Sequence, residues 1–168
     1  MQGLRLLFLN HYFMSELRSV LTRSEKKEET KVQEHKHYDY SGKHVLLVED
    51  NELNREIATA ILEGAGMEVD TATDGTEAVE IMDKAAEDKY DLIFMDIQMP
   101  KMDGYTATRE IRTLKNNRKA NIPIVAMTAN AFEEDRKKSF DTGMNGHIVK
   151  PINMDDIAKV LETIFVEE

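Results

Sequence analysis

Acidic residues end two of the chain's short apolar runs, and a hydroxyl and an amine end two others. Glu49 and Asp50 follow one run and Asp96 follows another, while Thr128 and Lys150 close two later runs. If such runs form neighbouring parallel strands, their last residues meet at one edge of the sheet, about 4.8 Å apart from strand to strand. We therefore expect these five side chains to share one crevice.

Three carboxylates in one crevice are unfavourable without a counter-charge. Two such charges about 4 Å apart repel by roughly 4 kcal/mol at an effective dielectric near 20, so the cluster either raises a pKa or binds a cation. Oxygen ligands without nitrogen or sulfur select Mg²⁺ or Ca²⁺, and a site with few carboxylates leaves room for water and phosphate oxygens, as Mg²⁺ prefers. Helix capping by Asp50 or Asn51 is the alternative, but capping explains one acid and not three.

The hydroxyl of Thr128 and the ammonium of Lys150 would complete an anion site beside these acids. Lysine places a compact positive charge against one phosphoryl oxygen, threonine donates a hydrogen bond to a second, Mg²⁺ neutralises a third, and Asp96 is left as the nucleophile. Taken singly, Thr128 is typical of a strand-end hydroxyl and Lys150 of a surface amine. Their placement, one per strand, favours the shared site.

The elements that must position these residues alternate along the chain from residue 43 onward. Short apolar runs predict five strands, at 45–48, 67–72, 92–95, 124–127 and 148–149. Apolar residues at helical spacing lie between and after them: Leu53, Ile57, Ala60 and Ile61; Ala78, Ile81, Met82 and Ala85; Ala107, Ile111 and Leu114; Phe132, Ser139 and Phe140; Ile157, Val160, Leu161 and Ile164. This alternation predicts an α/β fold, a parallel sheet with helices on both faces.

Strand composition indicates the order of the strands in the sheet. The first, third and fourth runs are continuously apolar, as strands buried on both faces are. The second run alternates apolar and acidic residues and the fifth is very short, so both suit sheet edges. The prediction is a doubly wound five-stranded parallel sheet in the order 2-1-3-4-5, with its ligand crevice beyond the carboxyl ends of the first and third strands.

Composition limits what the chain can bind. It holds 22 Lys and Arg against 32 Asp and Glu, a formal charge of −10 that repels nucleic acid. It has no cysteine, which excludes disulfides and thiolate chemistry, and no apolar run approaches the roughly 20 residues needed to span a bilayer. We expect no direct membrane contact.

Residues 1–42 differ from the rest of the chain. Ser24–His37 is almost entirely charged or polar, a composition that cannot offset the entropy cost of ordering, so we expect a flexible linker there. Ahead of it, apolar residues between Phe13 and Leu21 permit a short amphipathic helix. We predict a leader over 1–42, whose origin stays open, and one folded domain over 43–168.

Four stretches of the chain resemble the receiver domain of two-component response regulators. They are VLLVEDN at 45–51, MDIQMPKMDG at 95–104, MTANA at 127–131 and GMNGHIVKPI at 143–152. Together they leave little room for chance. The resemblance implies a flavodoxin-like fold and a signalling switch in which Asp96 takes a phosphoryl group from phosphohistidine. It also implies that Glu49, Asp50 and Asp96 hold Mg²⁺ together with the backbone carbonyl of Gln98.

The same resemblance implies roles for the remaining residues of the crevice. Thr128 and Lys150 would sense the phosphoryl oxygens, and the peptide bond after Lys150 would be cis. His147 falls at the family's aromatic switch position, where a titratable ring would couple switching to pH; a ring that only fills the surface of an edge strand is the equal alternative. Gln98 and Asn130 occupy positions that modulate hydrolysis of the aspartyl phosphate.

The motifs look most like those of receivers at the C-terminal end of hybrid sensor kinases. The implied partners are a histidine kinase domain and a histidine-phosphotransfer protein, with no nucleic acid, and a homodimer stays open. A freestanding single-domain response regulator fits almost as well. A receiver of this kind catalyses its own phosphorylation and dephosphorylation, and within a hybrid kinase the full protein would be a histidine kinase. The expected location is the cytoplasm, or the cytoplasmic portion of a membrane-bound sensor kinase.

A function from another class also uses an aspartate nucleophile at a strand end. Mg²⁺-dependent phosphohydrolases of the haloacid dehalogenase type generally carry a second aspartate two residues on, where this chain has Gln98. The chain also offers no cap domain to close over a small substrate. We therefore expect negligible turnover of organic phosphates.

Overall fold

Five parallel strands form one sheet in the order β2-β1-β3-β4-β5, as the sequence predicted. The computed structural model describes residues 38–165. The strands are β1 His44–Val48, β2 Glu68–Ala72, β3 Leu92–Asp96, β4 Ile124–Thr128 and β5 Gly146–Val149. All residues of β3 and β4 are buried, whereas β2 at the edge is partly exposed, so apolar composition predicted strand burial correctly.

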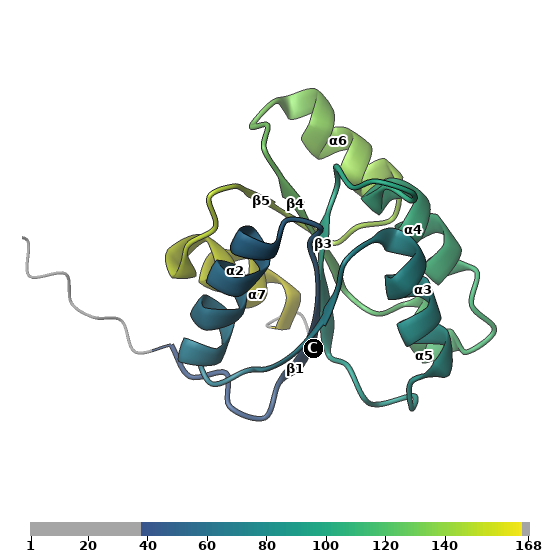
Figure 1. The fold of residues 1–168 in the computed structure, drawn as a ribbon, viewed down its shortest axis with the longest axis horizontal. Coiled ribbons are helices and arrows are strands. Elements are labelled where there is room, and N and C mark those ends of the chain that lie inside the picture. The colour runs from purple at the N-terminus through teal and green to yellow at the C-terminus, as the bar shows by residue number, and fades with distance from the viewer. Residues whose placement is uncertain (1–37, 166–168) are drawn as a thin grey trace, which may run out of the picture. The chain divides into compact units, whose positions relative to one another are not determined.

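Helices cover both faces of this sheet (Figure 1). They are α2 Glu52–Gly64, α3 Gly75–Lys84, α4 Gly104–Arg112, α5 Asn117–Ala120, α6 Glu133–Asp141 and α7 Met154–Phe165. One core cluster lies between the sheet and helices α2 and α7, and the other lies between the opposite face and helices α3 and α4. The sequence did not predict α5, because four residues are too few to show a helical period.

Side-chain caps determine where the helices after β1, β2 and β3 begin. Asn51, Asp74 and Asp103 each accept a backbone hydrogen bond from the first turn of α2, α3 and α4, respectively. At the start of α2 the cap is therefore Asn51 and not Asp50. This leaves the carboxylate of Asp50 at the carboxyl end of the sheet.

The predicted buried face of α2 is wrong except for Ile61, which is partly buried and packs against the core. Leu53 and Ile57 are 64% and 50% exposed, and the buried residues are Ala58 and Leu62. Two apolar stripes run side by side along this helix, and periodicity alone does not distinguish them. The stripe that packs is the one continued by buried Ala65, where the chain turns toward β2.

The predicted buried face of α6 is right for Ser139 and wrong for the two phenylalanines. Phe132 and Phe140 are 70% and 43% exposed, and Ser139 is the one buried residue of this helix. Most of the other side chains of α6 are charged, so the helix has little apolar surface to place against the sheet. A small side chain such as Ser139 lets the helix backbone approach its neighbours even though α6 lacks an apolar face.

Residues 38–42, which the sequence assigned to the leader, contact the folded domain. The amide of Tyr40 donates to the carbonyl of Ala65 at 2.8 Å, and the Tyr40 side chain packs against the core. The boundary between residues 42 and 43 stays a prediction.

The helix predicted near Phe13 and the linker Ser24–His37 lie outside the described residues. Within residues 38–165, none of the helices combines the length and apolarity needed to cross a bilayer.

Candidate functional site

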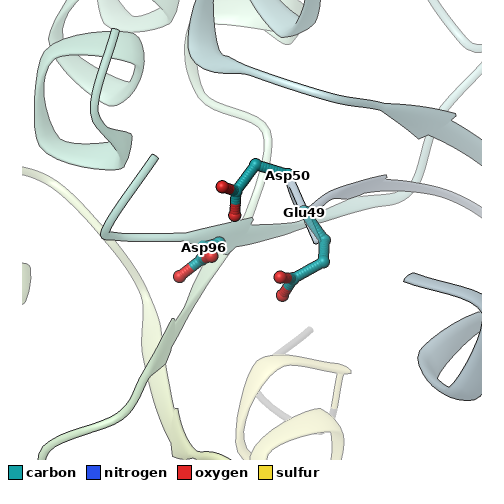
Figure 2. Close-up of side chains that lie close together, drawn as sticks. All are labelled: Glu49, Asp50 and Asp96. Atoms are coloured by element: carbon teal, nitrogen blue, oxygen red, sulfur yellow. The ribbon is translucent and has the colours of Figure 1, made fainter. Parts of the chain in front are cut away.

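The carboxyl ends of β1 and β3 bring three acids together (Figure 2). Glu49, Asp50 and Asp96 each place a carboxylate oxygen within 4.8 Å of the others. The register explains this arrangement, because Val48 of β1 pairs with Met95 of β3 and the acids follow directly. Glu49 and Asp96 are buried, whereas Asp50 is exposed. The cluster therefore has one side in the protein interior and one side open to solvent.

Lys150 bridges the two buried acids of this cluster. Its Nζ lies 2.5 Å from Oε2 of Glu49 and 2.8 Å from Oδ2 of Asp96. The peptide bond between Lys150 and Pro151 is cis, as the resemblance implied. One ammonium thus serves two buried carboxylates while Asp50 adds a third negative charge. The site keeps an excess of negative charge that a cation would neutralise.

The pKa values of the bridged groups reflect this imbalance. Burial raises the pKa of Asp96, and the nearby Glu49 raises it further, against the opposing effect of the Lys150 ammonium. Burial alone would lower the pKa of Lys150, but its hydrogen bonds to Asp96 and Glu49 together outweigh burial and raise it. Both directions follow from two carboxylates sharing one ammonium in a partly dry site.

The loop between β1 and α2 holds Glu49 and Asp50 in place. Oε1 of Glu49 accepts hydrogen bonds from the amide of Asn51 and from Nδ2 of Asn54, both at 3.3 Å. Nη1 of Arg55 donates to the carbonyl oxygen of Glu49 at 2.9 Å and to that of Asp50 at 3.3 Å. Sequence reasoning missed Asn54 and Arg55. Their spacing, four and five residues after Asp50 in the first turn of a helix, was the available signal.

The loop between β3 and α4 closes over Asp96 from the other side. Oδ1 of Asp96 accepts a hydrogen bond from the amide of Gln98 at 3.3 Å. Gly104 packs so closely that a Cβ there would collide with the backbone carbonyl of Asp96. Lys101 adopts φ +63° and places Nζ 2.7 Å from Oδ2 of the capping residue Asp74, which ties this loop to the start of α3.

Thr128 ends β4 and Lys150 directly follows β5, so both lie at the same edge of the sheet. The amide of Lys150 donates to the carbonyl of Thr128 at 2.7 Å. The side chain of Thr128 is buried, and its Oγ1 accepts a hydrogen bond from the amide of Asn130 at 3.1 Å. The hydroxyl is therefore held at the end of β4, one strand from Asp96.

His147 lies on β5 and is half-buried. Its Nδ1 is buried and makes no hydrogen bond within the described part of the chain. Burial lowers the pKa of His147, and the positive charge of Arg136 lowers it further. The ring borders a pocket of about 260 Å³ between α6, β5 and α7, whose lining includes Arg136, Phe140 and Val160.

The sequence and the fold are similar to known signalling proteins. Residues 45–162 match the sequence model of the response regulator receiver domain. The chain is 41% identical over 121 residues to hybrid signal transduction histidine kinase L of Dictyostelium discoideum, covering 70% of this chain and 7% of that protein. It is 41% identical over 128 residues to histidine protein kinase 1 of Candida albicans, covering 71% of this chain and 5% of that protein. The chain thus matches only a small part of each relative.

Two solved structures illustrate the likeness in fold. The receiver domain of sensor histidine kinase PA1611 from Pseudomonas aeruginosa PAO1, with a magnesium ion coordinated in its active site cleft, is 39% identical, with a TM-score of 0.63 over 73% of this chain and 96% of that one. The receiver domain of Saccharomyces cerevisiae Ssk1, in a co-crystal with the histidine phosphotransfer protein Ypd1, is 31% identical, with a TM-score of 0.64 over 71% of this chain and 86% of that one.

Proposed function

This chain belongs to the response regulator receiver domain family, and on that premise we propose that Asp96 is the phosphoacceptor of a two-component phosphorelay. The observation that carries the proposal is the contact of Lys150 with both Glu49 and Asp96, beside the exposed Asp50. The proposed nucleophile Asp96 is buried, the Lys150 ammonium can bind phosphoryl oxygens, and Asp50 makes the solvent-facing side of the site acidic. All three groups lie at one edge of the sheet.

The three acids fit Mg²⁺, because they offer only oxygen ligands and carry more negative charge than Lys150 neutralises. Glu49, Asp50 and Asp96 would hold the ion, with the Gln98 carbonyl as a further ligand. When bound, Mg²⁺ supplies positive charge that stabilises the phosphoryl oxygens during transfer. The oxygen-only donor set and the excess charge are the support for this part of the proposal.

In the proposed reaction, a carboxylate oxygen of Asp96 attacks the phosphorus of a phosphohistidine. A P–O bond forms as the P–N bond breaks, and the imidazole nitrogen leaves with the electron pair of the broken bond. The Lys150 ammonium opposes the rise in the pKa of Asp96 that burial causes, and it then binds a phosphoryl oxygen. The hydroxyl of Thr128 donates to a second oxygen.

The switch follows from the added charge. The phosphoryl group brings about −1.5 to −2 charges, so Lys150 and Thr128 shift toward it. His147 borders a pocket of about 260 Å³, where its ring has room to change position as Thr128 moves. Gln98 and Asn130, next to the site, would modulate hydrolysis. The surface formed by α6, β5 and α7 would then differ between the two states.

The proposed partner is a histidine-phosphotransfer protein, with the chain acting as a receiver of a hybrid histidine kinase on the cytoplasmic side. A donor must approach Asp96 from the open side of the crevice, where Asp50 is exposed. Leu53 and Ile57 are exposed apolar residues in the helix that begins just after Asp50. An exposed apolar pair beside a charged site suits a partner protein that first binds this surface and then transfers its phosphoryl group to Asp96.

Phosphorylation of Asp96 is tested by mass spectrometry after incubation with acetyl phosphate and Mg²⁺. We expect one base-labile phosphoryl adduct on the peptide that contains Asp96, and none on Asp96→Asn. Asp103→Asn is the matched control, because Asn caps a helix as well as Asp does and should be labelled normally. Labelling of Asp96→Asn contradicts the proposal, and steady release of phosphate from an aryl phosphate ester favours the phosphohydrolase instead.

Docking is tested with the double variant Leu53→Ser and Ile57→Ser. We expect phosphotransfer from a histidine-phosphotransfer protein to slow at least tenfold, while labelling by acetyl phosphate stays unchanged because the crevice is intact. Phe132→Ser removes an apolar side chain at the N-cap of α6 that is at least as exposed, and it should leave both rates unchanged. Equal transfer rates for the double variant and the wild type contradict this docking surface.

A further inference from the structure

One arginine holds both peptide units that flank Asp50. Nη1 of Arg55 donates to the carbonyl oxygen of Glu49 at 2.9 Å and to that of Asp50 at 3.3 Å. The first carbonyl belongs to the peptide unit before the Asp50 Cα and the second to the unit after it. A donor that holds both units restrains φ and ψ of Asp50, and with them the direction in which its side chain leaves the backbone.

Asp50 is the acid that most needs such a restraint. Glu49 accepts from Asn51, Asn54 and Lys150. The carboxylate of Asp96 accepts from Gln98 and is paired with Lys150. The carboxylate of Asp50 is exposed and accepts no hydrogen bond from residues 38–165. Its direction toward the other two acids therefore depends on the backbone.

Arg55 is itself held by a rigid element. It lies in the first turns of α2, and its amide donates to the carbonyl of the capping residue Asn51 at 2.9 Å. The same helix is anchored to the core by the buried side chains of Ala58 and Leu62. A guanidinium presented from this helix can fix the preceding loop, because its planar group directs its donors in set directions.

We infer that Arg55 is a positioning residue that keeps the carboxylate of Asp50 directed into the acid cluster and so strengthens binding of a divalent cation. The inference rests on the proposed function, because it assumes that the cluster binds Mg²⁺. The direction in which Mg²⁺ affinity changes when Arg55 is replaced distinguishes positioning from a simple charge effect. The positive charge of Arg55 near a cation site would by itself weaken Mg²⁺ binding, whereas its positioning effect strengthens it.

The test is the dissociation constant for Mg²⁺, measured by isothermal titration calorimetry without any phosphodonor. Arg55→Met removes the charge and the donors but keeps the apolar stem, and Arg55→Lys keeps the charge but loses the planar donor group. We expect Mg²⁺ to bind about tenfold more weakly to both, a loss near the lower end of what a hydrogen bond from a charged donor contributes. Arg109→Met, an exposed arginine on α4, is the control and should match the wild type.

The Mg²⁺ affinities of the two variants and of the wild type decide whether Arg55 has a positioning role. Unchanged Mg²⁺ binding in both variants overturns the positioning role, because Arg55 then has no effect on the site. Tighter binding to Arg55→Met also overturns it, because the repulsion between the Arg55 charge and the cation is then the dominant effect. Absence of Mg²⁺ binding by the wild type overturns the proposed metal site and this inference with it. A melting curve by circular dichroism in Mg²⁺-free buffer reports whether each variant is folded. If Arg55→Met is unfolded, the result for Arg55→Lys decides.

Discussion

Two polar clusters of this domain use similar residues to opposite effect. At the carboxyl ends of the strands, Lys150 contacts Glu49 and Asp96. Toward the amino ends, Asp70 of β2 accepts from Nζ of Lys89 and from the hydroxyl of Tyr90, both at 2.6 Å, and lies 3.3 Å from Nε2 of His44. The rings of His44 and Tyr90 are 5.0 Å apart, edge to face.

The difference lies in the ratio of donors to acids. Hydrogen bonds from Lys89 and Tyr90 lower the pKa of Asp70, so its charged form is favoured in the folded protein. Burial raises the pKa of Asp96. The one ammonium that pairs with Asp96, that of Lys150, is shared with Glu49. The cluster around Asp70 is satisfied and stabilises the fold, whereas the crevice keeps unsatisfied negative charge. An unsatisfied charge can be neutralised by a ligand, so this imbalance favours the crevice as the functional site.

The largest difference between the clusters should come from removing each ammonium. Lys150→Met leaves two buried carboxylates unpaired and should cost about 3 kcal/mol in the free energy of unfolding at pH 7. Lys89→Met breaks a pair that is about two-fifths exposed, with side-chain exposures of 40% and 39%, and should cost under about 1 kcal/mol. Urea unfolding of both variants measures this, and equal losses would show that the crevice is not the more dependent cluster.

A smaller and opposite pair of effects should come from neutralising one acid in each cluster. Asp96→Asn removes an excess charge and should stabilise the domain by about 1 kcal/mol, a typical gain where function costs stability. Asp70→Asn weakens a satisfied network and should destabilise it by up to about 1 kcal/mol. Thermal unfolding at neutral pH compares the two, and a shift of the same sign in both variants would contradict the comparison.

The smallest effect is the pH dependence of those two differences. The folded pKa of Asp70 is lowered, so its stabilisation is complete above its unfolded pKa, about 3.9, and is lost as pH falls below it. The folded pKa of Asp96 is raised, so its penalty is present at neutral pH and is relieved as pH falls through that raised value. On acidification, the gain in Asp96→Asn should therefore disappear before the loss in Asp70→Asn does. Unfolding curves between pH 7 and about pH 3 follow both differences, and the reverse order would contradict the assigned directions.

The helix faces mark the limit of sequence prediction in this chain. Strand runs are short and apolar on both sides, so burial followed from composition alone. In α2, neighbouring residues such as Ile57 and Ala58 offered alternative apolar stripes, and only packing selected Ala58. In α6, the charged composition removed the stripe that Phe132 and Phe140 indicated.

The site shows the same limit at the level of side chains. The positions of Glu49, Asp96 and Lys150 at strand ends follow from where apolar runs stop, and parallel strands bring such ends together. The contacts of Arg55 with two backbone carbonyls had no counterpart in any apolar pattern, because a hydrogen bond to the backbone leaves no periodic signal in the sequence.

By itself, the sequence determined the strand order and the acids at one edge of the sheet, since these depend on local composition and chain direction. Only the tertiary structure decided which sides of α2 and α6 are buried, that Lys150 contacts two acids at once, and that Arg55 reaches back to the loop before its helix. The buried helix faces and the double contact of Lys150 depend on distances between separate elements, which are set when side chains pack and not by the residues near them in the chain.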